Sequence, residues 1–140
     1  PGKESIKEYG LERFTSYSGN IKRAEAINLS VSSQLLLIPL NKADNAKGRI
    51  PGKLFEYLRA KVPIICFGPE GSDVERILLE TQHGINFNYD DQQAIKNYIS
   101  ELFEKWENGI EPIANSTDIS KYSVKNQTKK IALFLNEISS

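Results

Sequence analysis

The residues best suited to chemistry lie in the stretch 48–58, Gly-Arg-Ile-Pro-Gly-Lys-Leu-Phe-Glu-Tyr-Leu. Pro51 suits the first turn of a helix, and Gly52 has no side chain to keep a ligand away from its backbone. The N–H groups of Gly52, Lys53 and Leu54 are expected to point out of the helix end. Unpaired amides at a helix N-terminus favour an anion, so this stretch predicts an anion-binding site.

Two charged side chains extend this prediction. Lys53 adds a positive charge beside the amides, and Glu56 lies three residues later, on the same side of the helix and one turn deeper. A carboxylate there can accept two hydrogen bonds from a vicinal diol such as a ribose. A second interpretation stays open, in which Pro51 and Gly52 merely start a helix and Glu56 is a solvated surface charge.

The stretch is not a P-loop. That motif requires G-x-x-x-x-G-K-[ST], but the position five residues before Gly52 is Lys47. Leu54 also stands where the hydroxyl that binds Mg²⁺ is needed. The sequence holds no G-x-G-x-x-G motif either.

The elements that must position these residues alternate between strand and helix. Apolar or β-branched runs predict strands over 14–17, 34–38, 63–67 and 84–88. Helices are expected over 3–9, 21–29, 51–60, 72–80, 91–107 and 124–138. This alternation predicts an α/β fold of the Rossmann-like, three-layer αβα kind with a parallel sheet. Runs 34–38 and 63–67 read as strands that are buried on both faces.

Ligands of such sheets bind beyond the carboxyl ends of the strands. The loops to examine are therefore Ser18–Ile21, Asn41–Gly52, Gly68–Asp73 and Asn88–Asp91.

Other reactive residue types have simpler interpretations. His83 precedes Gly84 at a helix–strand junction, which favours a surface turn residue over a general base. Cys66 lies in an apolar strand and Trp106 continues a helical apolar stripe, so both are expected to pack in the core. Asp90 or Asp91 is expected to cap a helix.

Composition narrows the functional class. The chain has 140 residues, with 18 Lys+Arg and 18 Asp+Glu, so its formal net charge is zero. That balance argues against a nucleic-acid-binding protein and against a domain that binds membranes through a polybasic surface. One cysteine excludes an intramolecular disulfide and a multi-cysteine metal site. The chain contains no methionine and opens at Pro1, from which we expect a fragment of a longer protein or a processed chain.

Several of these segments together resemble a known family. They are Leu35–Pro39, Pro51–Leu58, Pro63–Ile65 and Gly68–Glu70. They look like the C-terminal half of GT-B glycosyltransferases, and are most similar to bacterial family 4 retaining enzymes with a P-G-K-L-F-E-Y signature. The resemblance runs from about Ser5 to the C-terminus.

The resemblance implies that the chain binds the nucleotide-diphosphate sugar donor of a sugar transferase. Glu56 then binds the donor ribose, and the amides of Gly52, Lys53 and Leu54 face the diphosphate. Asn20 and Ile21 belong to a loop that passes the nucleobase. The resemblance calls for no metal or other cofactor, and it leaves the catalytic residues, the sugar and the acceptor unassigned.

The sequence also departs from the family pattern. Many members carry Glu-x₇-Glu, but Gly48 stands at the first glutamate, whose role is then absent or moved, for example to Asn45. A whole domain of this type has six strands, and only four are predicted here. The chain is therefore expected to lack its first strands and the N-terminal acceptor domain, to be inactive alone, and to self-associate through the truncated sheet or rearrange it. The full enzyme is expected in the cytoplasm, at the inner face of the membrane or free of it.

A non-catalytic module is the alternative reading. A receiver-like or flavodoxin-like interaction domain needs an acidic cluster or a flavin-phosphate loop at a strand end. The candidate acids Asp73, Glu75, Asp90 and Asp91 are scattered over separate segments.

Overall fold

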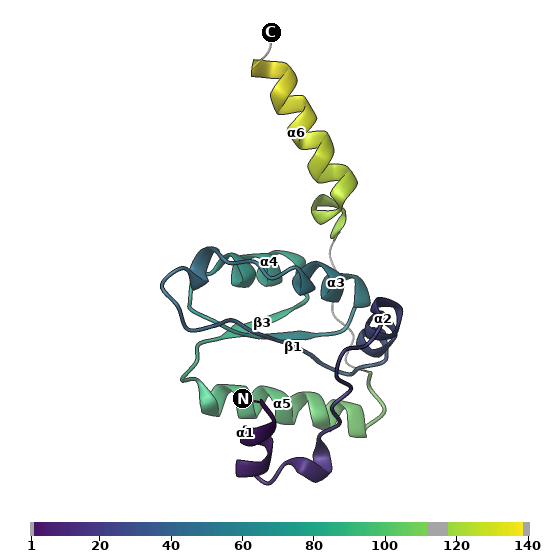
Figure 1. Ribbon diagram of the computed structural model, residues 1–140, viewed down its shortest axis with the longest axis vertical. Helices are drawn as coiled ribbons and strands as arrows, with labels where there is room; N and C mark the ends of the chain where they lie inside the picture. The colour runs from purple at the N-terminus through teal and green to yellow at the C-terminus, as the bar shows by residue number, and fades with distance from the viewer. Residues whose placement is uncertain (1, 112–117, 139–140) are drawn as a thin grey trace.

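The computed structural model describes residues 2–111 and 118–138 as a three-layer α/β fold with one projecting helix (Figure 1). In chain order the elements are α1 (Gly2–Glu8), η1 (Glu12–Phe14), α2 (Arg23–Val31), β1 (Leu36–Pro39), η2 (Ala46–Gly48), α3 (Lys53–Ala60), β2 (Ile64–Phe67), α4 (Asp73–Thr81), β3 (Gly84–Phe87), α5 (Gln92–Glu107), η3 (Ser120–Tyr122) and α6 (Val124–Ile138), where η marks a 3₁₀-helix.

The sheet is parallel, with strand order β1-β2-β3. Leu36 pairs with Ile64, and Ile64 pairs in turn with Gly84. Helices α3 and α4 cover one face and α5 lies against the other (Figure 1). The predicted fold class is confirmed, and the carboxyl ends of all three strands meet at one edge of the sheet, where the loop after β1 leads into α3.

The core lies between the sheet and the α3–α4 layer. Leu54 and Leu58 of α3, with Val74 and Leu78 of α4, are almost fully buried against the strands. Their spacing of four residues puts each pair on the same helix face, which is the face an amphipathic helix turns to a sheet. The remaining face of α3 is free to present Glu56 outward.

Strand β1 is buried on one face only, so the prediction of burial on both faces is wrong for it and right for β2. Leu36 and Ile38 point into the core, whereas Leu37 stays 50% exposed. Neighbouring strands lie about 4.8 Å apart and a helix is about 10 Å wide, so α5 alone does not cover the width of this sheet.

The outer edge of β1 is unpaired among the described residues. Leu36 and Leu40 donate their backbone N–H groups to Pro63 and Phe67. Successive residues of a strand face alternate edges, so the backbone of Leu37 and Pro39 faces outward. Pro39 has no N–H and loses no hydrogen bond there, which is the usual place for proline in a sheet.

The predicted strand over 14–17 is wrong. Glu12–Phe14 form a 3₁₀-helix, and Phe14 and Tyr17 are 71% and 69% exposed. The Thr15 hydroxyl donates to the Leu11 carbonyl at 2.9 Å, and the Thr15 N–H bonds to Glu12. These local bonds occupy groups that a strand would offer to a neighbour.

Helix α6 projects away from the three layers (Figure 1). Its apolar side chains are largely exposed, including Val124 at 83%, Ile131 at 60% and Phe134 at 60%. No helix in the described part of the chain is both long and apolar enough to cross a membrane.

Candidate functional site

A groove of about 580 Å³ runs along the outer side of α3, and we call it the α3 groove. Gly52 and Glu56, both predicted as site residues, line it together. Its lining is Arg23, Gly52, Phe55, Glu56, Leu58, Arg59, Ile119, Ser120, Tyr122, Ser123 and Val124. Three segments distant in sequence therefore meet at this groove.

Glu56 is held by a cation from another helix. Its Oε1 lies 3.2 Å from Nη2 of Arg23, at the start of α2. The two side chains are 46% and 79% exposed, so water screens the pair and it adds little to stability. Its effect is local, because Arg23 contacts one of the two carboxylate oxygens of Glu56.

The N-terminus of α3 differs in part from expectation. Gly52 is the N-cap residue, and no side chain caps this end. The Leu54 N–H was predicted to be unpaired, but it donates to the Pro51 carbonyl at 3.0 Å. The Leu54 side chain is fully buried in the core. A Cβ on Gly52 would meet nothing within 4 Å, so glycine is not required here by the fold.

The other predicted site residues lie beside the groove but do not line it. Lys53 is exposed at the start of α3. Asn20 is exposed and Ile21 is partly buried, immediately before the α2 terminus that carries Arg23. The structure therefore brings the predicted nucleobase loop and the predicted ribose carboxylate into the same region.

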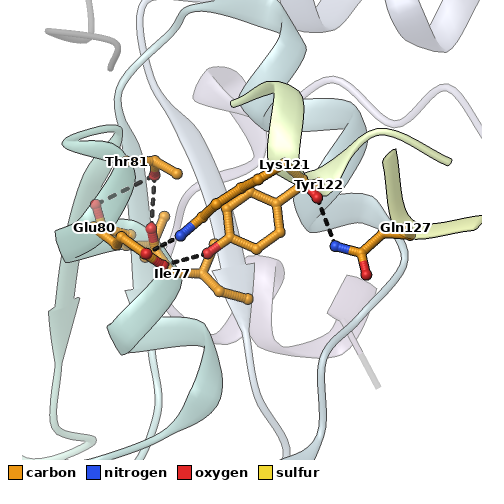
Figure 2. A network of polar contacts seen from close by, with 7 residues as sticks. Ile77, Glu80, Thr81, Lys121, Tyr122 and Gln127 are labelled. Atoms are coloured by element: carbon orange, nitrogen blue, oxygen red, sulfur yellow. Dashed lines mark hydrogen bonds and ion pairs between the residues drawn. The ribbon is translucent and has the colours of Figure 1, made fainter. Parts of the chain in front are cut away.

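The opposite wall of the groove is the segment 119–124, anchored on α4 (Figure 2). The Tyr122 hydroxyl donates to Oε2 of Glu80 at 2.5 Å, and Lys121 forms an ion pair with the same carboxylate. The Tyr122 ring also lies 6.0 Å from the ring of Phe55. Burial is the main cause that raises the pKa of Tyr122 above its usual value, and the charge of Arg76 opposes the rise.

A second, smaller groove lies on the other side of the same ion pair. It has a volume of about 200 Å³, and Arg23, Glu56 and Arg59 line both grooves. Ile27 and Val31 of α2 make its floor apolar. The Arg23–Glu56 ion pair therefore lines both grooves.

The histidine prediction is wrong, because His83 is 1% exposed. Its Nδ1 lies 2.8 Å from the Thr81 carbonyl, and Nε2 is buried with no hydrogen-bond partner among the described residues. The reason is the short α4–β3 connection, in which Gln82 adopts a left-handed conformation and turns the next side chain inward.

The remaining predictions have mixed outcomes. Cys66 is in the core, where burial is the main cause that raises the pKa of its thiol to about 12. Trp106 is 49% exposed and contacts Phe103, so its predicted core position is wrong. Asp91 is the N-cap residue of α5, as predicted, but its side chain accepts from the Asn88 N–H at 2.9 Å and from no helix amide.

The acidic residues that a receiver-like module would need do not form a cluster in the described part of the chain. Within residues 2–111 and 118–138, no group of three or more His, Cys, Asp or Glu side chains lies close enough to hold a metal ion. Asp73 instead pairs with Arg76, and Glu75 accepts from the Gly71 N–H at 2.6 Å. A receiver-like acidic pocket is therefore not formed by these residues.

Sequence reasoning missed Arg23 and the segment 119–124. Neither stands in a motif, and each reaches Glu56 only through the packing of α2 and η3 on α3. A signal for the second was present in Tyr122, the one aromatic residue of the sequence between Trp106 and Phe134.

Comparison of the chain with protein-family models, with curated proteins and with solved structures found no match.

Proposed function

We propose that the α3 groove binds the nucleoside diphosphate part of a nucleotide-sugar donor, as the donor-binding half of a retaining glycosyltransferase. The observation that carries this proposal is that Gly52 and Glu56 line one groove at the end of α3 that follows β1. Gly52 begins α3 directly after the loop that follows β1, and loops of this kind contribute to ligand binding in such folds. From Gly52 the groove extends along the outer side of α3.

The spacing suits the two halves of the ligand. Gly52 and Glu56 are four residues apart, which is about 6 Å along a helix axis, comparable to the separation of a ribose diol from its diphosphate. The Glu56 carboxylate accepts from the ribose hydroxyls. The Gly52 and Lys53 amides and the Lys53 ammonium face the diphosphate and stabilise its charge as it leaves.

Transfer itself requires an acceptor half, supplied by a further domain that completes the cleft. The chain alone is then a donor-binding unit without turnover, and the proposal places the whole enzyme in the cytoplasm, where nucleotide sugars are substrates. No metal and no other cofactor enters this scheme.

Thermal unfolding with added UDP, GDP or FMN tests the proposal. A nucleoside diphosphate is expected to raise the Tm, since a ligand that binds only the folded state stabilises it by mass action. Glu56→Ala is expected to remove that rise without lowering the Tm of the free protein, because Glu56 is half exposed. Stabilisation by FMN alone would overturn the proposal and favour a flavodoxin-like module.

Gly52→Ala provides a second probe of the same groove. The added methyl meets no atom of the fold, so the free protein should keep its stability within about 0.5 kcal/mol. A diphosphate that approaches the Gly52 backbone should bind at least about tenfold more weakly, because the methyl occupies the approach. The matched control is Gly48→Ala, which also meets no atom and lies outside the groove lining.

A further inference from the structure

We propose that Arg23 is a positioning residue for Glu56 and sets the preference of the α3 groove for ribose over 2′-deoxyribose. This inference rests on the proposed function, because it concerns the sugar that the Glu56 carboxylate accepts. It adds a residue from α2 that no motif of the chain contains.

The first argument is the geometry of the ion pair. Nη2 of Arg23 lies 3.2 Å from Oε1 of Glu56, and both side chains line the α3 groove. An ionised carboxylate offers about four acceptor positions on its two oxygens. One arginine contact uses one of them, which leaves Oε2 and the second lone pair of Oε1 for two hydroxyl groups.

The second argument concerns what else fixes Glu56. Its side chain is 46% exposed, and within the described residues the structure gives it no hydrogen bond from a third group. A half-exposed glutamate samples several rotamers, and a carboxylate must hold one orientation to accept from both hydroxyls of a diol. Arg23 is the group that selects the orientation.

The third argument is that the pair does little for the fold. No residue of α2 is buried, and Arg23 is 79% exposed. Exposed ion pairs contribute little to folding stability because water and salt screen them. Removing Arg23 should therefore leave the fold intact and change the orientation of Glu56 alone.

The test measures discrimination by isothermal titration calorimetry. UDP, GDP and ADP are each titrated against their 2′-deoxy forms, and the best-binding pair is kept. The unchanged protein is expected to bind the ribo form about 10–100-fold more tightly, the usual effect of a hydrogen bond to a charged group. In Arg23→Ala this ratio should fall by about two- to fivefold, the usual effect of losing an exposed ion pair, while affinity for the 2′-deoxy form stays within about twofold.

Further variants separate positioning from other roles. Arg23→Lys should restore part of the ratio, because an ammonium holds a carboxylate less well than the planar guanidinium. The double variant Arg23→Ala/Glu56→Gln should have the same ratio as Glu56→Gln alone, since the two residues act as one unit. The control is Lys105→Ala, which removes an exposed 2.6 Å ion pair with Glu101 on α5 and should leave the ratio unchanged.

The outcomes are distinct. An unchanged ratio in Arg23→Ala overturns the inference but leaves the proposed function standing. An equal loss of affinity for both forms also overturns it, because Arg23 would then contact the phosphates directly. If the unchanged protein binds no nucleoside diphosphate, or does not distinguish the two sugars, the proposed function of Glu56 fails and the inference fails with it.

Discussion

At the scale of single residues, local chemistry in this protein depends on whether a side chain faces the core or the groove. Cys66 and Glu56 illustrate the contrast. The Cys66 thiol is fully buried in β2, next to apolar neighbours, while Glu56 points outward from α3 into solvent and toward Arg23. Burial disfavours the charged thiolate form of Cys66. The Glu56 carboxylate keeps its charge at little cost, because it is exposed to water and lies beside a cation.

The first prediction concerns the reactivity of Cys66. Burial, with a smaller contribution from Glu75, raises the pKa of its thiol to about 12, so almost no thiolate exists at pH 8. Since the thiolate is the reactive form, maleimide labelling of the folded protein should be at least about 100-fold slower than labelling in denaturant. Equal rates measured by mass spectrometry would contradict this.

The same pKa shift has a consequence for stability at alkaline pH. The folded state keeps its proton up to about pH 12, while an unfolded thiol loses it near its ordinary pKa of 9.0. The unfolded state therefore binds fewer protons in this window, and the free energy of unfolding falls as pH rises from 9 toward 12. Cys66→Ala should show a shallower fall in urea titrations.

A second prediction at this scale concerns Gly84 of β3. A Cβ built there would overlap the Ile64 carbonyl of the neighbouring strand. Gly84→Ala should therefore lower the free energy of unfolding by about 1–3 kcal/mol, because the strand pair must separate to admit the methyl. Gly48→Ala, with no atom within 4 Å, should be neutral in the same denaturant titration. Equal stability of the two variants would be evidence against close β2–β3 packing.

At the scale of elements, the helices and the three strands of the sheet were predictable because their signals are local. The apolar spacing in α3 and α4 is enough to predict helices, and the apolar run of β2 is enough to predict a strand. The segment 14–17 has strand-forming residues, but a strand also needs a partner, which no local pattern reports. The burial of His83 likewise depends on the backbone conformation of Gln82.

The candidate site was predictable in part for the same reason. Gly52 and Glu56 share one helix, so their spacing fixes their relation. Arg23 and Tyr122 come from other elements, and only tertiary packing brings them to the groove. The partner of Glu56 and the opposite wall of the groove therefore could not be found from the sequence.

The third prediction concerns the segment 119–124 as an element. Glu80 holds both Lys121 and Tyr122, so Glu80→Ala removes two contacts of the groove wall at once (Figure 2). Loss of about 1 kcal/mol of local stability should speed hydrogen exchange of the 120–123 amides about fivefold. Glu101→Ala, which breaks the exposed pair on α5, is the control and should leave those amides unchanged.

At the scale of the whole molecule, apolar surface remains uncovered on several sides. Leu37 of β1 is 50% exposed, Phe103 of α5 is 52% exposed, and α6 presents a further apolar face. Among the described residues the outer edge of β1 is also unpaired, and with these surfaces it supports the proposal that copies of this chain associate when no other domain covers them.

The fourth prediction follows from this surface. Light scattering at high protein concentration should show species larger than the monomer. Leu37→Lys should shift the population toward monomer, because a charge at a free strand edge opposes pairing. Leu79→Lys is the control, since Leu79 is equally apolar and 65% exposed but lies on α4, away from that edge. A monomer at every concentration contradicts the proposal.

The root of α6 is also a wall of the groove. Tyr122, Ser123 and Val124 line the groove, and the helix that begins at Val124 is 15 residues long. Such a helix is about 22 Å long, and it follows directly on the segment that Glu80 holds. A partner that binds α6 therefore contacts an element that is continuous with the wall of the α3 groove.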